Sequence, residues 1–439
     1  MANIKPFRGY RYNPEKTGGL DKVVSPPYYN INPEEKQSLY AISEYNSVRL
    51  FSGMNEAGDS ETNNRFTRAA KYLNDWIREG ILERDEEPAI YMYEQTLVMH
   101  NIQYQNRCFV ALAELEDFSS GIISSCEEIR EVSLQDRYDF LTNTNADLSM
   151  ISCLYIEREK DLLNLMTAIS EEKPDMEFDS YDNIHQRVWK ITDQPTIDCI
   201  VSGFKDLQLY ITDGQTRYET CLKYRDYMKE NNPKHTGKEP YNYTMLSLSN
   251  ANSDGIVILP VHRAVKTKKP FREEYFISGI QDHFKIEKII VDSRDEGIIP
   301  TMKKQIATKR METKIAMYHS GNYFFRLTLK DKEYIKNELL PDKSDAYCGL
   351  DVVVLNNLVI KDVMHIHDED FEECVKSSRI SRECLKQVED GEADVMFVMN
   401  PVKNEQIRSL AAAGERMPMR TLSVFPKPSV GVLINIKED

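Results

Sequence analysis

Tyr210-Ile-Thr-Asp-Gly-Gln-Thr-Arg-Tyr218 is the stretch on which the expected fold of this chain of 439 residues depends. Apolar residues alternate along positions 207–212, a pattern that predicts a strand. The strand stops abruptly at Asp213-Gly214, and a helix is expected over about 217–230. Thr216 and Glu219 would form a capping box at its start. The pattern therefore predicts a strand, a tight turn and a helix in direct succession.

The residues at this junction suit a phosphate group. A helix N-terminus offers free backbone N–H groups, and Gly214 lets the backbone approach an anion closely. Arg217 can hold phosphate oxygens with its guanidinium fork, and Thr216 can donate its hydroxyl. Asp213 can bind a metal or orient a substrate beside this cationic pocket. The GxxxxGK[ST] pattern of a P-loop is absent, so the junction predicts a phosphate cradle of another kind.

The composition narrows the classes of function. Hydrophobic residues make up 41% and charged residues 29%, as in globular proteins, and the formal net charge is -15. This acidity argues against a duplex-DNA partner and against a membrane-surface role. There is no run of about 18 apolar residues and no apolar segment of a signal peptide, so a cytoplasmic protein is expected. The eight cysteines are scattered, so we expect neither disulfides nor a zinc site.

Strand and helix patterns alternate along the chain and predict a mixed α/β to α+β fold. Positions 89–98 and 102–115 are expected to form a hairpin after a helix at 61–84, and positions 430–436 a last strand. Lys266-Thr-Lys-Lys-Pro270 is the expected domain boundary, which divides the chain into 1–265 and 266–439. His365 and His367 precede an acidic run, which favours a solvated surface over a metal site.

Asp213-Gly-Gln-Thr-Arg217 resembles the DGHxR signature of serine kinases of the ParB/sulfiredoxin superfamily. The whole chain resembles the family long catalogued as domain of unknown function 1015, which includes pyrophosphate-dependent kinases acting on free L-serine. The other matching pieces follow in family order: Lys5-Pro-Phe-Arg-Gly9, Val24-Ser-Pro-Pro-Tyr28, Cys126-Glu127, Asp136-Arg137, Leu259-Pro-Val-His-Arg263, Ala413-Gly-Glu-Arg-Met-Pro418 and Phe425-Pro-Lys427.

The resemblance implies a ParB/sulfiredoxin-like phosphate-binding catalytic core in 1–265 and an additional mixed α/β domain in 266–439. Glu127 would be the general base on the acceptor hydroxyl, and Asp213 would be catalytic and hold Mg²⁺. Tyr28 and Asp136 would contact the substrate. The implied phosphate-binding residues are Gly214, Gln215, Thr216, Arg217, Arg137, His262 and Arg263.

Two departures from the family pattern bear on activity. Gln215 and Cys126 stand where the family has histidines, and a glutamine can donate a hydrogen bond but cannot shuttle a proton. The expected function is transfer of a phosphoryl group from pyrophosphate, or a nucleotide, to free L-serine or a similar small molecule. The alternative is a catalytically altered paralogue that binds nucleotide or phosphate as a regulatory module. A DNA-associated factor is the least favoured, and the pattern leaves a homo-oligomer open.

Overall fold

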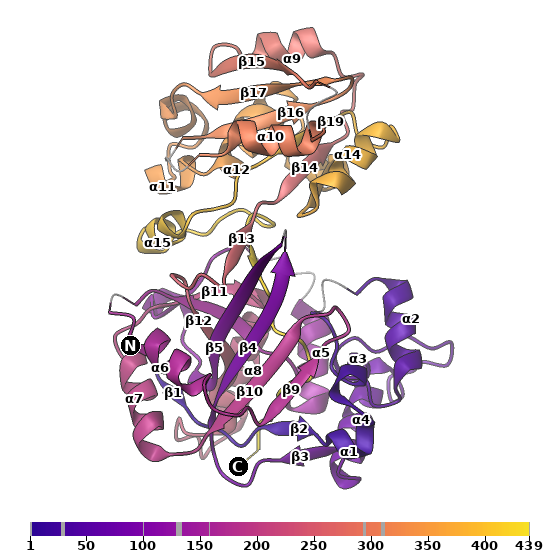
Figure 1. Ribbon diagram of the computed structural model, residues 1–439, viewed down its shortest axis with the longest axis vertical. Helices are drawn as coiled ribbons and strands as arrows, with labels where there is room; N and C mark the ends of the chain where they lie inside the picture. Colours follow the sequence, from indigo (N-terminus) through magenta and orange to yellow (C-terminus); the bar gives the residue numbers. More distant parts are fainter. Residues whose placement is uncertain are drawn as a thin grey trace. The chain divides into compact units, whose positions relative to one another are not determined.

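The computed structural model describes residues 2–27, 31–99, 101–128, 134–157, 159–292, 296–308 and 312–438. Its contact pattern divides the chain into two units, and each has its own sheet and core (Figure 1). The first unit consists of Met1–Ser125, Ile129–Val257 and Pro426–Asp439, and the second of Cys126–Glu128 and Ile258–Phe425. The division at Val257 comes before the expected boundary of 265, and the last 14 residues belong to the first unit rather than to a C-terminal domain.

The first unit is built on a nine-stranded mixed sheet with the order β6-β11-β8-β12-β5-β4-β10-β9, to which β1 adds beside β5. The expected hairpin is confirmed, because β4 and β5 pair antiparallel from Tyr91↔Val110 to Met99↔Ile102. The strands of this unit are β1 (Ile4–Lys5), β2 (Tyr10–Tyr12), β3 (Leu82–Arg84), β4 (Ile90–Met99), β5 (Ile102–Glu114), β6 (Ile123–Ser125), β7 (Ala146–Asp147), β8 (Ile151–Tyr155), β9 (Met176–Asp179), β10 (His185–Ile191), β11 (Leu209–Asp213), β12 (Tyr243–Asn250) and β21 (Asn435–Ile436).

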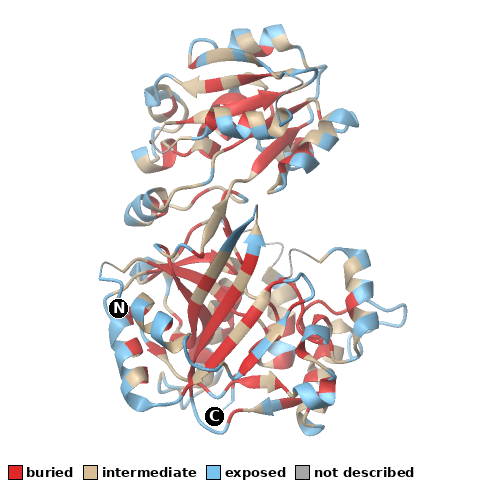
Figure 2. Ribbon diagram, in the orientation of Figure 1, coloured by how far each residue is buried: buried red, intermediate tan, exposed pale blue. Residues whose placement is uncertain are grey.

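Alternation along the strands gives this sheet two buried faces. Tyr91 and Tyr93 pack in one core, and their neighbours Ile90 and Met92 pack in the other. Side chains point to opposite faces at successive strand positions, so both faces of the sheet can be covered. Figure 2 shows long buried stretches along these strands. The helices are α1 (Pro14–Thr17), α2 (Pro33–Ile42), α3 (Val48–Phe51), α4 (Arg65–Arg78), α5 (Leu134–Thr144), α6 (Asp161–Ile169), α7 (Gln194–Phe204) and α8 (Gln215–Asn231).

The second unit contains a six-stranded sheet with the order β15-β17-β16-β19-β14-β18. Met317 and Phe397 face one core, and Ala316 and Met396 face the other. The elements from the division onward are β13 (Val257–Leu259), β14 (His262–Val265), α9 (Glu273–Ile280), β15 (Phe284–Ile290), α10 (Ile298–Ile306), β16 (Lys314–Tyr318), β17 (Tyr323–Leu329), η6 (Ile335–Leu339), α11 (Asp345–Cys348), α12 (Asp351–Val353), η7 (Val354–Val363), α13 (Asp368–Cys374), β18 (Val375–Ser378), α14 (Ser381–Glu389), β19 (Val395–Val398), α15 (Asn404–Ala412) and β20 (Ser423–Phe425).

Two segments of the backbone have conformations that the sequence pattern does not predict. The segment η7 is a ten-residue π-helix, a conformation that is rare and usually limited to a single turn. Positions 430–436, expected to be one strand, instead form isolated bridges and the two-residue β21. Val430 pairs with Ser25 and Ile434 with Tyr10, so each bridge ties a different N-terminal segment and no continuous ladder forms.

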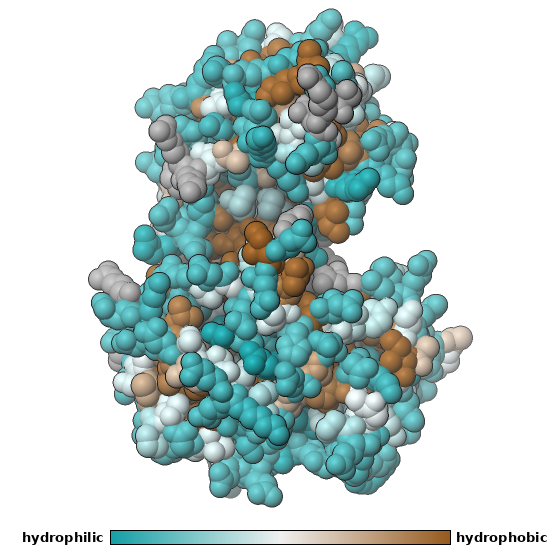
Figure 3. Space-filling model, in the orientation of Figure 1, coloured by the Kyte–Doolittle hydropathy of each residue, from teal (hydrophilic) through white to brown (hydrophobic). Residues whose placement is uncertain are grey.

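The surface in Figure 3 is mostly hydrophilic, in agreement with a charged fraction of 29%. None of the helices in the described part of the chain has the length and apolarity needed to span a bilayer.

Candidate functional site

The junction between β11 and α8 forms the turn on which the site depends. Gly214 is the N-cap of α8 and has φ +89°, a left-handed conformation that glycine adopts without a Cβ penalty. The helix therefore begins at Gln215, and Thr216 lies inside its first turn. The capping box expected for Thr216 and Glu219 is wrong, because Gly214 is the N-cap and none of the side chains that the structure describes caps this helix. Its first N–H groups consequently face outward without a side-chain acceptor.

Asp213 is the centre of a charged cluster at the carboxyl end of β11. Its Oδ2 accepts a hydrogen bond from Arg217 Nη2 at 2.9 Å, and its Oδ1 accepts one from Lys427 Nζ at 2.6 Å. Arg217 Nη1 also donates to Ser149 Oγ at 2.5 Å. The Asp213 and Lys427 side chains are only 12% and 13% exposed, so solvent screens this pair weakly. The cluster fixes the orientation of the Arg217 guanidinium.

Arg217 has a further donor available. Its Nε is buried and has no hydrogen-bond partner among the described residues. A Cβ on residue 214 would lie 2.8 Å from this Nε and 2.6 Å from Nη2, so glycine makes room for the guanidinium against the backbone turn. Buried polar groups are nearly always paired in folded proteins, so the Nε of Arg217 is unusual as a donor for which the described residues supply no acceptor.

A cavity of about 360 Å³ opens beside this turn. It is lined by Asp213, Gly214, Thr216 and Arg217 together with other residues of the first unit, which are Pro27, Arg65, Asp136, Arg137, Met150, Pro428 and Val430. Asp136 forms an ion pair with Arg65, and Arg137 Nη1 donates to the Phe51 carbonyl at 3.2 Å.

Positive charge prevails around this cavity. Among the described residues in or beside it, Arg65, Arg137, Arg217 and Lys427 outnumber the carboxylates Asp136 and Asp213. The pKa of nearby Lys36 is lowered by burial, and the charges of Arg65 and Arg137 lower it further, although Asp136 opposes them. In a chain of net charge -15, a local excess of cations favours an anionic ligand.

Six of the residues named from the sequence therefore line one cavity: Asp136, Arg137, Asp213, Gly214, Thr216 and Arg217. Gln215 lies beside them, and its Nε2 is 3.4 Å from the Ile211 carbonyl. Tyr28 is outside the described residues, although its neighbour Pro27 lines the cavity. Lys427 and Arg65 were not expected. The motif Phe425-Pro-Lys427 could have identified Lys427 as a site residue, but Arg65 lies in no such motif.

Three other predicted residues, Glu127, His262 and Arg263, belong to the second unit. Glu127 Oε1 accepts hydrogen bonds from the backbone N–H groups of Thr421 and Leu422, at 2.7 and 2.5 Å. These contacts hold the carboxylate in place, and its role as a base stays a prediction.

His262 and Arg263 are buried in β14. Burial lowers the pKa of Arg263 to about 10, and Glu127 partly opposes this effect. Burial lowers the pKa of His262 to about 3, and its Nδ1 accepts a hydrogen bond from the Met399 N–H at 3.1 Å. His262 is therefore neutral at physiological pH and supplies no positive charge to a phosphate.

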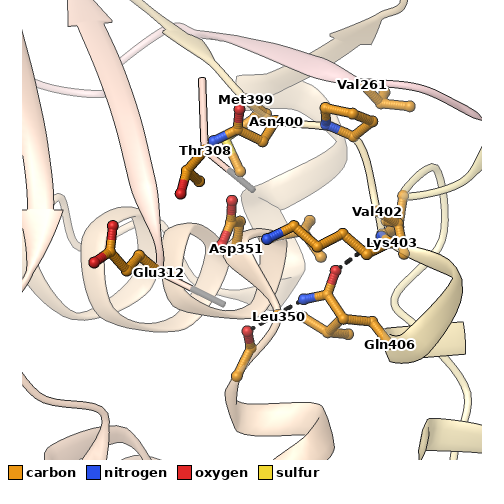
Figure 4. A pocket seen from close by; sticks show the side chains of 14 residues that line it. Val261, Thr308, Glu312, Leu350, Asp351, Met399, Asn400, Val402, Lys403 and Gln406 are labelled. Atoms are coloured by element: carbon orange, nitrogen blue, oxygen red, sulfur yellow. Dashed lines mark hydrogen bonds between the residues drawn. The ribbon is translucent and has the colours of Figure 1, made fainter. Parts of the chain in front are cut away.

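A different recess in the second unit contains a buried acid (Figure 4). Lys403 and Asp351 point toward one another there, and the recess measures about 30 Å³. Burial raises the pKa of Asp351 to about 6, against hydrogen bonds from Thr313 and Asn400 and the charge of Lys403. The space holds little more than water, so it is a weaker candidate for a phosphate site than the cavity at Gly214.

No group of three or more His, Cys, Asp or Glu side chains in the described ranges is placed to hold a metal ion. His365 and His367 accordingly form no such cluster. At the Gly214 cavity, Asp213 is the carboxylate that a magnesium ion would use, and both its oxygens accept hydrogen bonds from cations.

The fold and the site define a mixed α/β protein with a glycine turn and a cation-lined cavity at the start of a helix. The model of the family described as protein of unknown function (DUF1015) matches residues 4–353. The chain therefore belongs to this family, and the resemblance seen in its motifs is confirmed. A comparison with curated proteins gives no match.

Several solved structures are similar at low identity. A free serine kinase mutant in complex with AMP is 12% identical, with 75% of this chain and 92% of that chain covered and a TM-score of 0.37. A second free serine kinase mutant, in complex with ADP, is 11% identical, with 75% and 92% covered and a TM-score of 0.37. A conserved hypothetical protein from Pyrococcus furiosus is 12% identical, with 75% and 95% covered and a TM-score of 0.34.

Proposed function

We propose that this protein is a phosphotransferase that moves a phosphoryl group from pyrophosphate, or from a nucleotide, to the hydroxyl of free L-serine or a similar small molecule. The observation that carries the proposal is the turn at Gly214, where an uncapped helix N-terminus and Arg217 border a cation-lined cavity. The family motifs support the proposal, because one of them contains this turn and another contains Lys427, which bonds Asp213 at the turn. A ParB/sulfiredoxin-like core and a cytoplasmic location remain part of the same proposal.

Each residue at the turn has a defined part in this reaction. The first N–H groups of α8 and the Arg217 guanidinium hold the phosphoryl group that is transferred. Phosphoryl transfer depends mainly on positioning and on stabilisation of developing charge, which fixed cations supply. Asp213 holds Arg217 and Lys427 in place, so these cations need little reorganisation during the reaction. Glu127 remains the predicted base for the acceptor hydroxyl.

Magnesium belongs to the proposal as the partner of the donor. Mg²⁺ is usually held by one or two carboxylates together with phosphate oxygens and water, so Asp213 alone would be sufficient on the protein side. The ion would neutralise charge on the phosphate oxygens. Because Asp213 is already bonded to Lys427 and Arg217, the geometry favours a metal that arrives with the donor over one resident in the protein.

The test is a coupled assay for O-phosphoserine with magnesium, L-serine and pyrophosphate, ATP, ADP or CTP in separate reactions. Product with one donor supports the proposal and identifies that donor. Arg217→Ala should abolish turnover, because it removes the guanidinium from the cavity. Arg225→Ala is the matched control on the same helix, since Arg225 pairs with Asp117 and Asp226 instead. Full activity in Arg217→Ala would exclude this site.

The second candidate is a regulatory module that binds a phosphate compound without turning it over. It is favoured by Gln215, which occupies the position of a family histidine and has its amide nitrogen 3.4 Å from the Ile211 carbonyl. An amide in this place cannot carry a proton. A clear rise in melting temperature with one donor, and no product with any donor, would support this candidate.

A further inference from the structure

An apolar recess of about 60 Å³ adjoins the cavity at Gly214 in the first unit. Arg137 and Arg217 line both spaces. Arg217 Nη1 also donates to the hydroxyl of Ser149, which lines the recess. A ligand whose phosphoryl group lies at Gly214 is therefore next to the recess, and the reaction proposed above makes no use of this space.

The walls of the apolar recess consist mainly of hydrocarbon. They come from segments that are far apart in the sequence, including α3, α5 and β8. The large apolar side chains that line the recess are each at most 8% exposed, and they are Phe51, Phe140, Leu141, Leu148 and Ile151. An apolar group that leaves water for such a surface is stabilised in proportion to its buried area.

Apart from the two arginines, the polar side chains that border the recess are bonded within the protein. Asp147 accepts hydrogen bonds from Thr244 Oγ1 and Lys437 Nζ, at 3.2 and 3.1 Å. Thr220 Oγ1 donates to a carbonyl of its own helix at 2.7 Å. Burial raises the pKa of the Cys221 thiol to about 11, so this group is uncharged at physiological pH. A water molecule needs two to four polar partners, so the recess favours an apolar occupant.

The size of the recess limits this occupant to a short alkyl group. A cavity of about 150 Å³ with aliphatic and aromatic walls binds benzene. In proportion, a recess of about 60 Å³ has room for about two or three carbon atoms. A phenyl ring or a nucleobase is too large for it.

We propose that the apolar recess binds an alkyl group of the phosphoryl acceptor, so that the preferred acceptor is a small hydroxy compound with a chain or branch of two or three carbons rather than L-serine. This inference rests on the proposed function for the place of the phosphoryl group at Gly214. In the transfer, the acceptor oxygen bonds to phosphorus as the bond from phosphorus to the leaving oxygen of the donor breaks, and the hydroxyl proton passes to the predicted base Glu127. The product is a phosphate monoester with its alkyl group in the recess.

Isothermal titration of the full chain with inorganic phosphate and with methyl, ethyl, propyl, hexyl and phenyl phosphate tests the recess without any turnover. The affinity should rise about fourfold for each carbon from methyl to propyl phosphate, because each carbon leaves water, and should rise no further for hexyl phosphate. Phenyl phosphate should bind more weakly than propyl phosphate.

The titration separates this inference from the proposed function. Equal affinities for phosphate and all the alkyl esters would overturn the recess and keep the phosphate site at Gly214. Tighter binding of phenyl than of propyl phosphate would overturn the expected size of the occupant. Absence of binding by phosphate and by every ester would overturn both proposals. A rise in affinity with chain length, in a protein that makes no phosphorylated product, would keep the recess and exclude the transferase.

Leu148→Ala should extend the rise in affinity to hexyl phosphate and admit phenyl phosphate, because it removes part of the wall. Leu20→Ala is the matched control. Leu20 is 7% exposed and belongs to the same core, but it lines neither the recess nor the cavity at Gly214. An unchanged profile in folded Leu148→Ala, or the same change in both variants, would overturn the inference. The series on the unmodified chain decides the question where a variant fails to fold.

Discussion

At the scale of single residues, the pair formed by Asp213 and Lys427 joins positions 214 apart in the chain. Lys427→Met removes one of the two cations on Asp213, so the free energy of unfolding should fall by about 1–3 kcal/mol. Pyrophosphate should bind about tenfold more weakly, because the cavity loses a positive charge. Urea unfolding and calorimetric titration measure the two effects.

Lys266→Met is the control for this substitution, since Lys266 pairs with Asp394 in the second unit and its side chain is 50% exposed. An exposed ion pair contributes about 0–1 kcal/mol, so this variant should bind pyrophosphate as the unmodified chain does. Equal losses of pyrophosphate affinity in both variants would show that Lys427 acts through net charge alone.

Asp351 gives a second prediction at this scale. Its pKa is raised to about 6, so in the folded protein it holds its proton in a range where an unfolded chain has lost it. Stability is therefore lost as pH rises from about 4 to about 6. The variant Asp351→Asn has no charge to bury. Relative to this variant, the free energy of unfolding of the unmodified chain should fall by on the order of 2 kcal/mol between pH 4 and pH 7. Parallel pH dependences of urea unfolding in the two proteins would contradict this expectation.

At the scale of elements, the start of α8 depends on the conformation of Gly214. Gly214→Ala places a Cβ 2.6 Å from Arg217 Nη2 and forces a non-glycine residue to φ +89°, so it should cost about 1–2 kcal/mol of stability and displace the guanidinium. Gly237→Ala has nearly the same backbone cost at φ +87° but meets no atom within 4 Å. Pyrophosphate affinity should fall only in Gly214→Ala, and equal affinities would mean that the turn does not shape the phosphate site.

The elements differ in how well their sequence predicts them. Helix α4 is predictable because its apolar residues recur at helical spacing, and the hairpin β4–β5 is predictable because two apolar runs, buried on both faces, are separated by a short polar segment. The helix α8 is also expected from the sequence, but its start is predicted too late in the chain. The prediction assumed a capping box at Thr216, whereas Gly214 in a left-handed conformation begins the helix at Gln215. The π-helix η7 has six buried residues of ten, and an apolar run of this kind carries no period that distinguishes a helix from a strand.

The same reasoning applies to the site. The turn residues 213–217 are adjacent in sequence, so a local motif identifies them together. Tertiary structure places Arg65 in the cavity wall and bonds Lys427 to Asp213 beside it, and Gly214 makes room for Arg217 only in the folded turn. Sequence patterns describe which residues could bind phosphate, whereas the excess of cations around one cavity depends on how distant segments pack.

At the scale of the whole molecule, the last segment of the chain returns to the first unit. Nothing in its composition marks this return, because a short run of buried apolar residues fits either unit equally well. Val430, Val432, Leu433 and Ile434 are at most 3% exposed and pack with residues from the beginning of the chain. Residues 430–434 are therefore part of the core next to the cavity at Gly214, which Val430 also lines.

A chain that ends at Phe425 should consequently fail to fold its first unit. The truncation removes four buried aliphatic side chains. Burial of each contributes about 1.5–3 kcal/mol to the free energy of unfolding, and the sum approaches the whole stability of a typical domain. It also removes Lys437, whose Nζ lies 3.1 Å from the buried carboxylate of Asp147 and donates to the Tyr243 carbonyl at 2.5 Å. An uncompensated buried charge costs about 3–5 kcal/mol, so Lys437→Met alone should be strongly destabilising.

Hydrogen exchange distinguishes the two units in this experiment. Peptides from β4, β5 and β12 should lose protection in the truncated chain, whereas those from β16 and β19 should keep it, because the core of the second unit contains no residue after 425. Truncation at 425 removes Lys427 as well, so pyrophosphate binding should vanish together with the protection. A truncated chain that keeps full protection in β12 would show that the first unit folds without its C-terminal segment, and would leave Lys427 dispensable for the fold.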